Sequence, residues 1–212
     1  MFIDTFFSLV SKFHHQKIAS YSKNLKVDCL IDVGCHKGEF LTSFLKIKKI
    51  KKFYCFEPQK DIFKKVKKNF KKKKNIKFYN FALGKIDVKK KIYLHNLTST
   101  SSLSQLNNDS FYLKFKNFLT RMNLEKQKSY YIKQKNFDKI FQNKSLKNTF
   151  LKIDVEGYEY QVLLGAKKKI KEIPYILIEQ QISNQYKNKS SEVKNFLIRN
   201  KFEIVKNFYF PT

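Results

Sequence analysis

The residues that could do chemistry in this chain are a few glycines and acids at predicted strand ends. Asp32 stands in the apolar segment 27–33, and Gly34 and Gly38 follow it directly. The chain has only five glycines, so two within one turn indicate backbone that bends tightly and approaches a ligand closely. The helix start beyond this turn exposes free N–H groups, which favour an anionic or carboxylate-bearing ligand.

Glu57 ends the next apolar strand, 53–56, and is followed by Pro58. It lies 23 residues after Gly34 (57 − 34 = 23), where an acid at a second strand end can accept both hydroxyls of a ribose. The turn is GxxxG and lacks both the GxGxxG of dinucleotide folds and the GxxxxGK[ST] of a P-loop, which disfavours an NAD-dependent dehydrogenase. A ribose acid without a phosphate cradle suits a phosphate-free nucleoside ligand such as S-adenosylmethionine.

A third group of acids follows two later strands. Asp154 and Glu156 come after an apolar run that begins at residue 150, and Glu179 comes after the segment 175–178. Glu159 falls in the first turn of a predicted helix, where capping alone explains a carboxylate. In a chain with 45 basic and 17 acidic residues, solvation does not call for carboxylates at strand ends. We therefore predict a shared ligand pocket lined by Asp32, Glu39, Glu57, Asp154, Glu156 and Glu179.

Alternating apolar strands and helices position these residues. Strands are predicted at 27–33, 52–56, 76–81, 150–153 and 175–178, with helices at 37–48 and 59–72. This order predicts a parallel sheet with right-handed crossovers, whose ligands lie beyond the carboxyl ends of the strands. Ala82 and Leu83, closing the third strand, would flank an adenine ring. A short strand is predicted at 89–94, and the runs 201–205 and 207–210 could pair antiparallel at a sheet edge.

The 212 residues fit one main domain. We assign residues 1–24 to an amphipathic helical segment, which either packs on the domain or makes peripheral contact with a membrane surface. Residues 25–212 form the main domain, with an insertion or lid at about 95–136. Three cysteines, an odd number, indicate buried thiols in a reducing compartment. With no membrane-span-length apolar run and no signal peptide, the prediction is a cytoplasmic protein.

The net charge of +28 raises the possibility of a polyanion partner. Lys, Asn, Ile, Phe and Tyr are enriched together, as an A/T-rich coding sequence produces, and the lysines are scattered over the chain. We interpret them as a solvated surface and predict no specific nucleic-acid partner. A non-catalytic basic module that binds an anionic glycan or nucleic acid stays open as the alternative function.

The chain resembles the FkbM family of S-adenosylmethionine-dependent methyltransferases. The resemblance covers about residues 27–180 and rests on segments 31–38, 56–58, 82–84 and 152–159, with Ser101, Ser102, Phe137, Asp138 and Glu179. It implies an α/β class I methyltransferase, a Rossmann-like three-layer sandwich with a mostly parallel seven-stranded sheet and one antiparallel strand. It also implies O-methylation of a hydroxyl on a sugar, glycan or related small-molecule acceptor. Cys35 and His36 depart from the family, which often has Ala and Asn there.

The site follows from the motifs and the resemblance together. The cofactor-binding residues are expected to be Asp32, Gly34, His36, Gly38, Glu57, Pro58, Ala82, Leu83 and Asp154. Ser101, Ser102 and Glu179 are expected on the acceptor side. A neutral hydroxyl needs a base to accept its proton, and Asp154, Glu156 and His36 are the candidates. No metal ligand set is predicted, although Asp154, Glu156, Glu179 and His36 could together hold a hard cation. The acceptor and the oligomeric state are not determined by the sequence.

Overall fold

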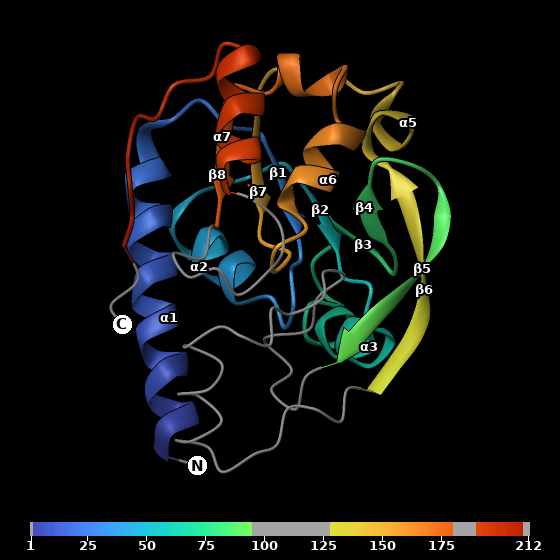
Figure 1. Ribbon diagram of the computed structural model, residues 1–212. Helices are drawn as coiled ribbons and strands as arrows, with labels where there is room; N and C mark the ends of the chain where they lie inside the picture. Colours follow the sequence, from blue (N-terminus) through green and yellow to red (C-terminus); the bar gives the residue numbers. More distant parts are fainter. Residues whose placement is uncertain (1, 95–127, 180–189, 210–212) are drawn as a thin grey trace.

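A computed structural model describes residues 2–94, 128–179 and 190–209 of the chain (Figure 1). Its strands are β1 Cys29–Val33, β2 Lys52–Phe56, β3 Ile76–Tyr79, β4 Ala82–Gly84, β5 Val88–Leu94, β6 Lys128–Asn136, β7 Thr149–Ile153 and β8 Tyr175–Ile178. Its helices are α1 Phe2–Tyr21, α2 Glu39–Ile47, α3 Lys60–Asn69, α5 Phe137–Phe141, α6 Glu159–Gly165 and α7 Ser190–Arg199, with short 3₁₀ helices η1 Ser22–Asn24 and η3 Lys169–Glu172.

Five parallel strands form the central sheet in the order β3-β2-β1-β7-β8. Every residue of β7 is buried, as are four of the five residues of β1 and of β2. Such continuous apolar runs are typical of strands covered on both faces. From β1 the chain first adds β2 and β3 on one side of β1 in the sheet, and it later adds β7 and β8 on the other side. The strand order therefore reverses between β1 and β7. Their carboxyl ends are therefore the expected ligand site of the sheet.

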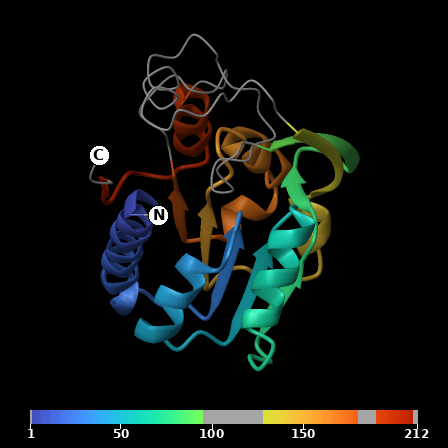
Figure 2. The same cartoon turned by 90° about the horizontal axis from the view of Figure 1, so that it is seen from below.

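Helices cover the two faces of this sheet, which makes three layers when the molecule is seen from below (Figure 2). One face packs against α1 and α2, with Phe40, Phe44, Phe53 and Phe150 among its buried residues. The other packs against α5 and α6, where Phe137, Phe141, Val162 and Leu163 are fully buried. The α2 helix forms because its apolar residues Phe40, Leu41 and Phe44 recur at helical spacing and lie on the buried side.

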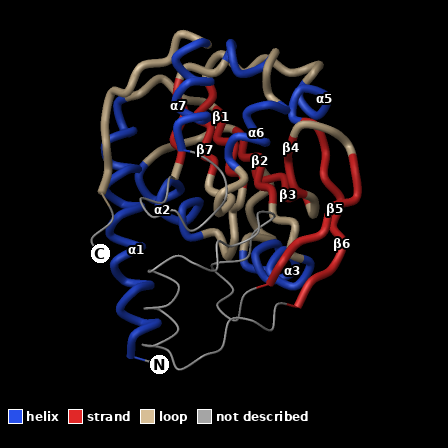
Figure 3. Tube along the Cα trace, in the orientation of Figure 1, coloured by secondary structure: helices blue, strands red, loops and turns tan. Residues whose placement is uncertain are grey.

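A second sheet has the order β4-β6-β5 and lies beside the central strands (Figure 3). Strands β5 and β6 pair antiparallel, whereas β4 and β6 pair parallel. Close packing holds this sheet to the core, because a Cβ added to Gly165 of α6 would lie 2.1 Å from the carbonyl oxygen of Gly84 in β4. The α/β fold and the parallel central sheet are confirmed, but one seven-stranded sheet with a single antiparallel strand is not: the described residues form these two sheets instead.

Other expectations about the elements have mixed outcomes. The helix expected within residues 1–24 and the short strand predicted at 89–94 are confirmed as α1 and β5. The prediction that Ala82 and Leu83 close the third strand is wrong, because β3 ends at Tyr79 and these residues form β4. The predicted strands at 201–205 and 207–210 are also wrong over the described residues to 209. Ile204, Val205 and Tyr209 are instead highly exposed, so that segment lacks the buried face that a sheet strand needs.

The insertion expected at about 95–136 lies outside the described residues as far as 127, and its last part is β6. None of the helices in the described part of the chain combines the length and the apolar character needed to cross a membrane. Among the α1 residues whose side chains are described, 11–21, Ile18 and Ala19 are buried and pack into the domain core.

Candidate functional site

The turn after β1 has a backbone that only glycine tolerates at two positions. Gly34 and Gly38 have φ values of +81° and +86°, and His36 between them has φ of +48°. A Cβ on Gly34 would lie 1.9 Å from the carbonyl oxygen of Asp154, so β1 and β7 meet at this point with no room for a side chain. The predicted tight turn at Gly34 and Gly38 is confirmed.

Glu57 lies at the tip of β2 with only 4% of its surface exposed. Its Oε2 accepts a hydrogen bond from the His36 amide at 3.0 Å, and its Oε1 accepts one from the Gln59 amide at 2.8 Å. Burial raises the pKa of Glu57 to about 7, although both backbone hydrogen bonds lower it. Each oxygen retains a second lone pair. The carboxyl group therefore braces the turn after β1 and keeps acceptor capacity for a ligand.

Lys152 is a site residue that the sequence analysis missed. It points from β7 toward the strand tips, and its ammonium lies 2.9 Å from Asp154 Oδ2, 3.4 Å from Asp32 Oδ1 and 3.1 Å from the Gly34 carbonyl oxygen. Asp32 and Lys152 are register partners in the sheet. The sequence contains this signal, because a lysine inside a buried and mostly apolar strand must find buried partners.

One ammonium serves two carboxylates in this cluster. Burial alone would lower the pKa of Lys152, but the charges of Asp154 and Asp32 raise it well above the usual lysine value. Burial raises the pKa of Asp32 despite the nearby ammonium. Both pKa shifts agree with the geometry. Asp154 is the carboxylate nearer to Lys152, and it has the larger effect on the pKa of Lys152. Asp32 is wholly buried and has no hydrogen bond of good geometry, so its own pKa is raised. The cluster is therefore short of positive charge.

His36 makes a pair with Glu39. The His36 Nδ1 and the Glu39 Oε1 are 3.0 Å apart, while His36 Nε2 is buried and has no hydrogen-bond partner among the described residues. Burial would raise the pKa of Glu39, but the hydrogen bond and charge of His36 lower it overall. An imidazole held by a carboxylate at one nitrogen and unpaired at the other resembles the orienting arrangement of a general base.

The turn after β7 is braced by Glu159 from the start of α6. Its Oε1 accepts hydrogen bonds from the amides of Val155 at 3.2 Å and Gly157 at 3.0 Å. Burial raises the pKa of Glu159 to about 7. Glu156 has φ of +53° in this turn. Glu159 is thus a structural acid, whereas the Asp154 side chain is 26% exposed and open to a ligand.

The remaining predicted residues lie in different places. Glu179 is exposed at the tip of β8, beside Asp154, whose charge above all raises the pKa of Glu179 to about 8. Ala82 and Leu83 are buried in β4 rather than at the tip of β3. Asn80 takes the position after β3, and its Nδ2 donates to the carbonyl oxygens of Glu57 at 2.9 Å and Pro58 at 3.0 Å. Ser101 and Ser102 lie outside the described residues.

Two further observations concern ligands. A cavity of about 520 Å³ lies between α6, η3 and α7, lined by Tyr160, Lys171, Phe196 and Arg199 among others, and contains none of the predicted site residues. Over the described residues, no three His, Cys, Asp or Glu side chains are grouped as metal ligands.

An open parallel sheet with a glycine turn and acids at its carboxyl edge is typical of Rossmann-like α/β domains. A family model described as the methyltransferase FkbM domain matches residues 32–204. The chain therefore belongs to the FkbM methyltransferase family, as the motifs predicted. No curated protein matches it.

Among solved structures, the chain is similar to methyltransferase FkbM from Methylobacillus flagellatus KT, with 17% identity and a TM-score of 0.47 over 72% of this chain and 32% of that one. A protein described as a candidate RNA methyltransferase from Pyrococcus horikoshii matches with 17% identity and a TM-score of 0.28 over 32% of this chain and 35% of that one. The chain thus spans about a third of the length of each of these proteins.

Proposed function

We propose that the chain is an S-adenosylmethionine-dependent methyltransferase that O-methylates a hydroxyl of a sugar, glycan or related small-molecule acceptor. Family membership supports methyl transfer. The observation that carries the cofactor assignment is the pairing of the Gly34 turn with the buried acid Glu57 at the tip of the adjacent strand. The sulfonium of the cofactor supplies a methyl group activated for displacement.

The residues at the strand tips fit such a cofactor. Four of the five buried side-chain atoms that lack a hydrogen-bond partner among the described residues are on Asp32, His36 and His15. Asp32 lies 3.4 Å from Lys152, His15 shares the Phe40 ring with Lys152, and His36 lies in the turn after β1, so unsatisfied polar groups gather where a polar ligand would bind. Glu57 would bind the ribose hydroxyls, Gly34 and Gly38 would allow close approach of the backbone, and Asp154 would face the cationic sulfonium.

Three candidates for the base stay in the proposal, and the geometry favours His36 among them. Asp154 is engaged by Lys152 at 2.9 Å, and Glu156 lies in a turn with positive φ. His36 has its Nδ1 oriented by Glu39, and its buried Nε2 has no hydrogen-bond partner among the described residues. A placed base contributes about 10²- to 10⁴-fold, and holding the acceptor oxygen in line contributes several kcal/mol more.

The decisive experiment is calorimetric titration of the purified chain with S-adenosylmethionine and with NAD. We expect heat with the first and none with the second, and the first signal should be lost in Glu57→Ala. Absence of binding to S-adenosylmethionine would refute the proposal. With binding established, Asp154→Asn should abolish methyl transfer and leave a folded protein; normal turnover in that variant would exclude an essential role for Asp154.

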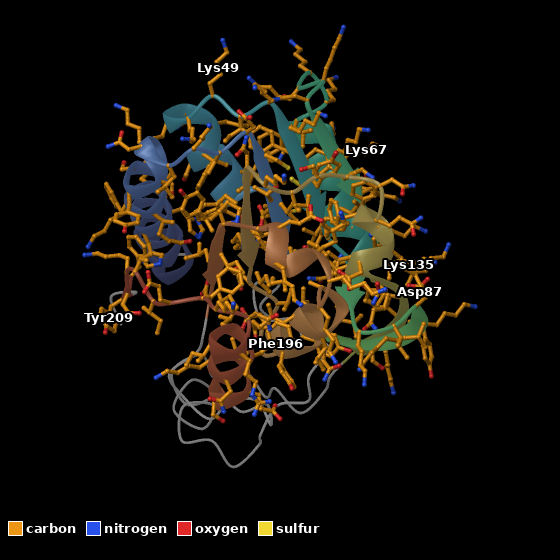
Figure 4. All side chains as sticks on the ribbon, turned by 90° about the horizontal axis from the view of Figure 1, so that it is seen from above. Lys49, Lys67, Asp87, Lys135, Phe196 and Tyr209 are labelled. Carbon is orange, nitrogen blue, oxygen red and sulfur yellow. The ribbon has the colours of Figure 1, made fainter. Side chains whose placement is uncertain are left out.

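The alternative of a polyanion-binding module is less well supported. Figure 4 shows lysine side chains, among them Lys49, Lys67 and Lys135, pointing outward from separate parts of the surface. Lys135 and Lys139 also pair with Asp87, at 3.7 and 3.4 Å. A module of that kind predicts binding to heparin or RNA that weakens steeply with salt, together with no affinity for S-adenosylmethionine.

A further inference from the structure

The helix α1 precedes the region that the family model matches, yet it contributes a residue to the candidate site. The His15 Nδ1 is one of the buried atoms without a hydrogen-bond partner in the described part of the chain. The other such atoms at the strand tips are both carboxylate oxygens of Asp32 and the Nε2 of His36. Buried polar atoms are rarely left unpaired in native proteins, so each one requires an explanation.

His15 reaches the site through Phe40. Its ring lies edge-on to the Phe40 ring with centroids 5.5 Å apart and an interplanar angle of 89°. The Lys152 ammonium lies 5.6 Å from the centroid of the same Phe40 ring and bonds Asp154 at 2.9 Å. Figure 1 shows α1 running beside the sheet, with its N-terminal part reaching past the tips of the central strands. It packs mainly against α2, whose Phe40 lies near both His15 and Lys152, so α1 borders the candidate site through α2.

His15 has the protonation state that a polar contact needs. Burial and the charge of Lys152 lower its pKa to about 4, against the smaller opposing effect of Asp154. The ring is consequently neutral at pH 7 and offers one N–H donor and one nitrogen acceptor. A neutral imidazole can pair with an ammonium through its acceptor or with a carboxylate through its donor.

We propose that His15 binds the amino-acid end of S-adenosylmethionine, an inference that rests on the function proposed above. Glu57 at the tip of β2 would hold the ribose, which places the nucleoside on the β2 side of β1. The other end of the ligand then points toward β7, where His15, Phe40 and Lys152 lie. That end carries an ammonium and a carboxylate, the two groups that a neutral imidazole can bind.

Two ligands separate this contact from simple packing of α1 against α2. S-Adenosylhomocysteine contains the amino-acid end, whereas 5′-methylthioadenosine keeps the nucleoside and lacks that end. The variants are His15→Phe, which keeps an aromatic ring against Phe40, and His15→Asn, whose amide lies near the position of Nδ1. His14→Phe is the matched control, because the neighbouring His14 ring packs edge-on to Phe208 instead, with centroids 6.4 Å apart.

Loss of one hydrogen bond should weaken S-adenosylhomocysteine binding to His15→Phe by about five- to tenfold. Binding of 5′-methylthioadenosine should not change, His15→Asn should recover most of the loss, and His14→Phe should bind both ligands as the wild-type protein does. Equal weakening for both ligands, or no weakening for either, would overturn the role of His15 while leaving the proposed function intact. If the wild-type protein binds neither ligand, the proposed function fails and this inference fails with it.

Discussion

The substitution Lys152→Met tests the physical account of the site most directly. It keeps an unbranched side chain of similar length against Phe40 but removes the ammonium that serves Asp32 and Asp154. The Asp154 side chain is 26% exposed and can turn to water, whereas that of Asp32 is 0% exposed and would be left without a partner. Breaking a buried ion pair on one side costs about 3–5 kcal/mol, and we expect a loss of that size in the free energy of unfolding at pH 8.

The loss should depend on pH in a defined direction. Burial already raises the pKa of Asp32 above its ordinary value of 3.8, and removing Lys152 takes away the charge that lowers it. A folded-state pKa above the unfolded value gives stability that is present in acid and is lost as pH rises through the folded pKa. The variant should therefore be closest to the wild-type protein near pH 5 and furthest from it near pH 8.

Urea unfolding followed by circular dichroism at pH 5 and pH 8 measures both effects. The control is Lys152→Met combined with Asp32→Leu, which replaces the buried carboxylate by an apolar side chain of similar shape. Replacing both partners of a buried pair is nearly neutral in several proteins, so the double variant should recover most of the loss. Three results would refute the reasoning. The single variant could lose less than about 1 kcal/mol in the free energy of unfolding at pH 8, or it could lose the same amount at both pH values. The double variant could also be no more stable than the single one.

Three further predictions follow from the geometry. Gly34→Ala should abolish S-adenosylmethionine binding in calorimetry and lower the melting temperature, because its Cβ would meet the Asp154 carbonyl oxygen at 1.9 Å; a variant that binds normally contradicts this. The affinity for S-adenosylmethionine should rise as the pH increases through the Glu57 pKa of about 7, since only the ionised carboxylate accepts hydrogen bonds from both ribose hydroxyls. Glu57→Gln should bind the cofactor weakly, with an affinity that does not change with pH. A pH dependence like that of the wild-type protein would exclude Glu57 as the ribose-binding acid. Because burial raises the Glu159 pKa from 4.5 to about 7, the contribution of Glu159 to stability should fall as the pH rises through that interval. Glu159→Gln keeps an acceptor for both amides, so its melting temperature should depend less on pH there than that of the wild-type protein. An unchanged pH dependence of the melting temperature would assign the effect to another group.

The central sheet was predictable because its strands are covered on both faces. The segments around Ile31, Phe53 and Leu151 are continuous apolar runs bounded by turns, and such runs identify parallel strands without any knowledge of their partners. The positions of Gly34, Glu57 and Asp154 at strand tips followed from the order of elements, since parallel strands end at one edge.

The second sheet was not predictable on that basis. Its strand β4 has three residues, and its pairing with Gln134, Lys135 and Asn136 in β6 joins segments about fifty residues apart. Local periodicity carries no information about such a pairing. Near the C-terminus the prediction failed in the opposite way. The short apolar runs at 201–205 and 207–210 suggested strands, but the described residues there form none, and Ile204, Val205 and Tyr209 are highly exposed.

The cluster around Lys152 contains more acid than base, although the chain as a whole is strongly basic. Asp32 and Asp154 together carry two negative charges against the one ammonium of Lys152, and Glu179 beside them has its pKa raised to about 8 chiefly by the charge of Asp154. A carboxyl pKa that is raised by a neighbouring carboxylate indicates negative potential at that position, and the same potential favours other cations. The strand tips are therefore locally negative although the chain carries +28 overall, which favours a sulfonium and disfavours a pyrophosphate. The lysine excess on the surface and the acid excess at the strand tips are thus independent features, and under the function proposed above the second would select the ligand.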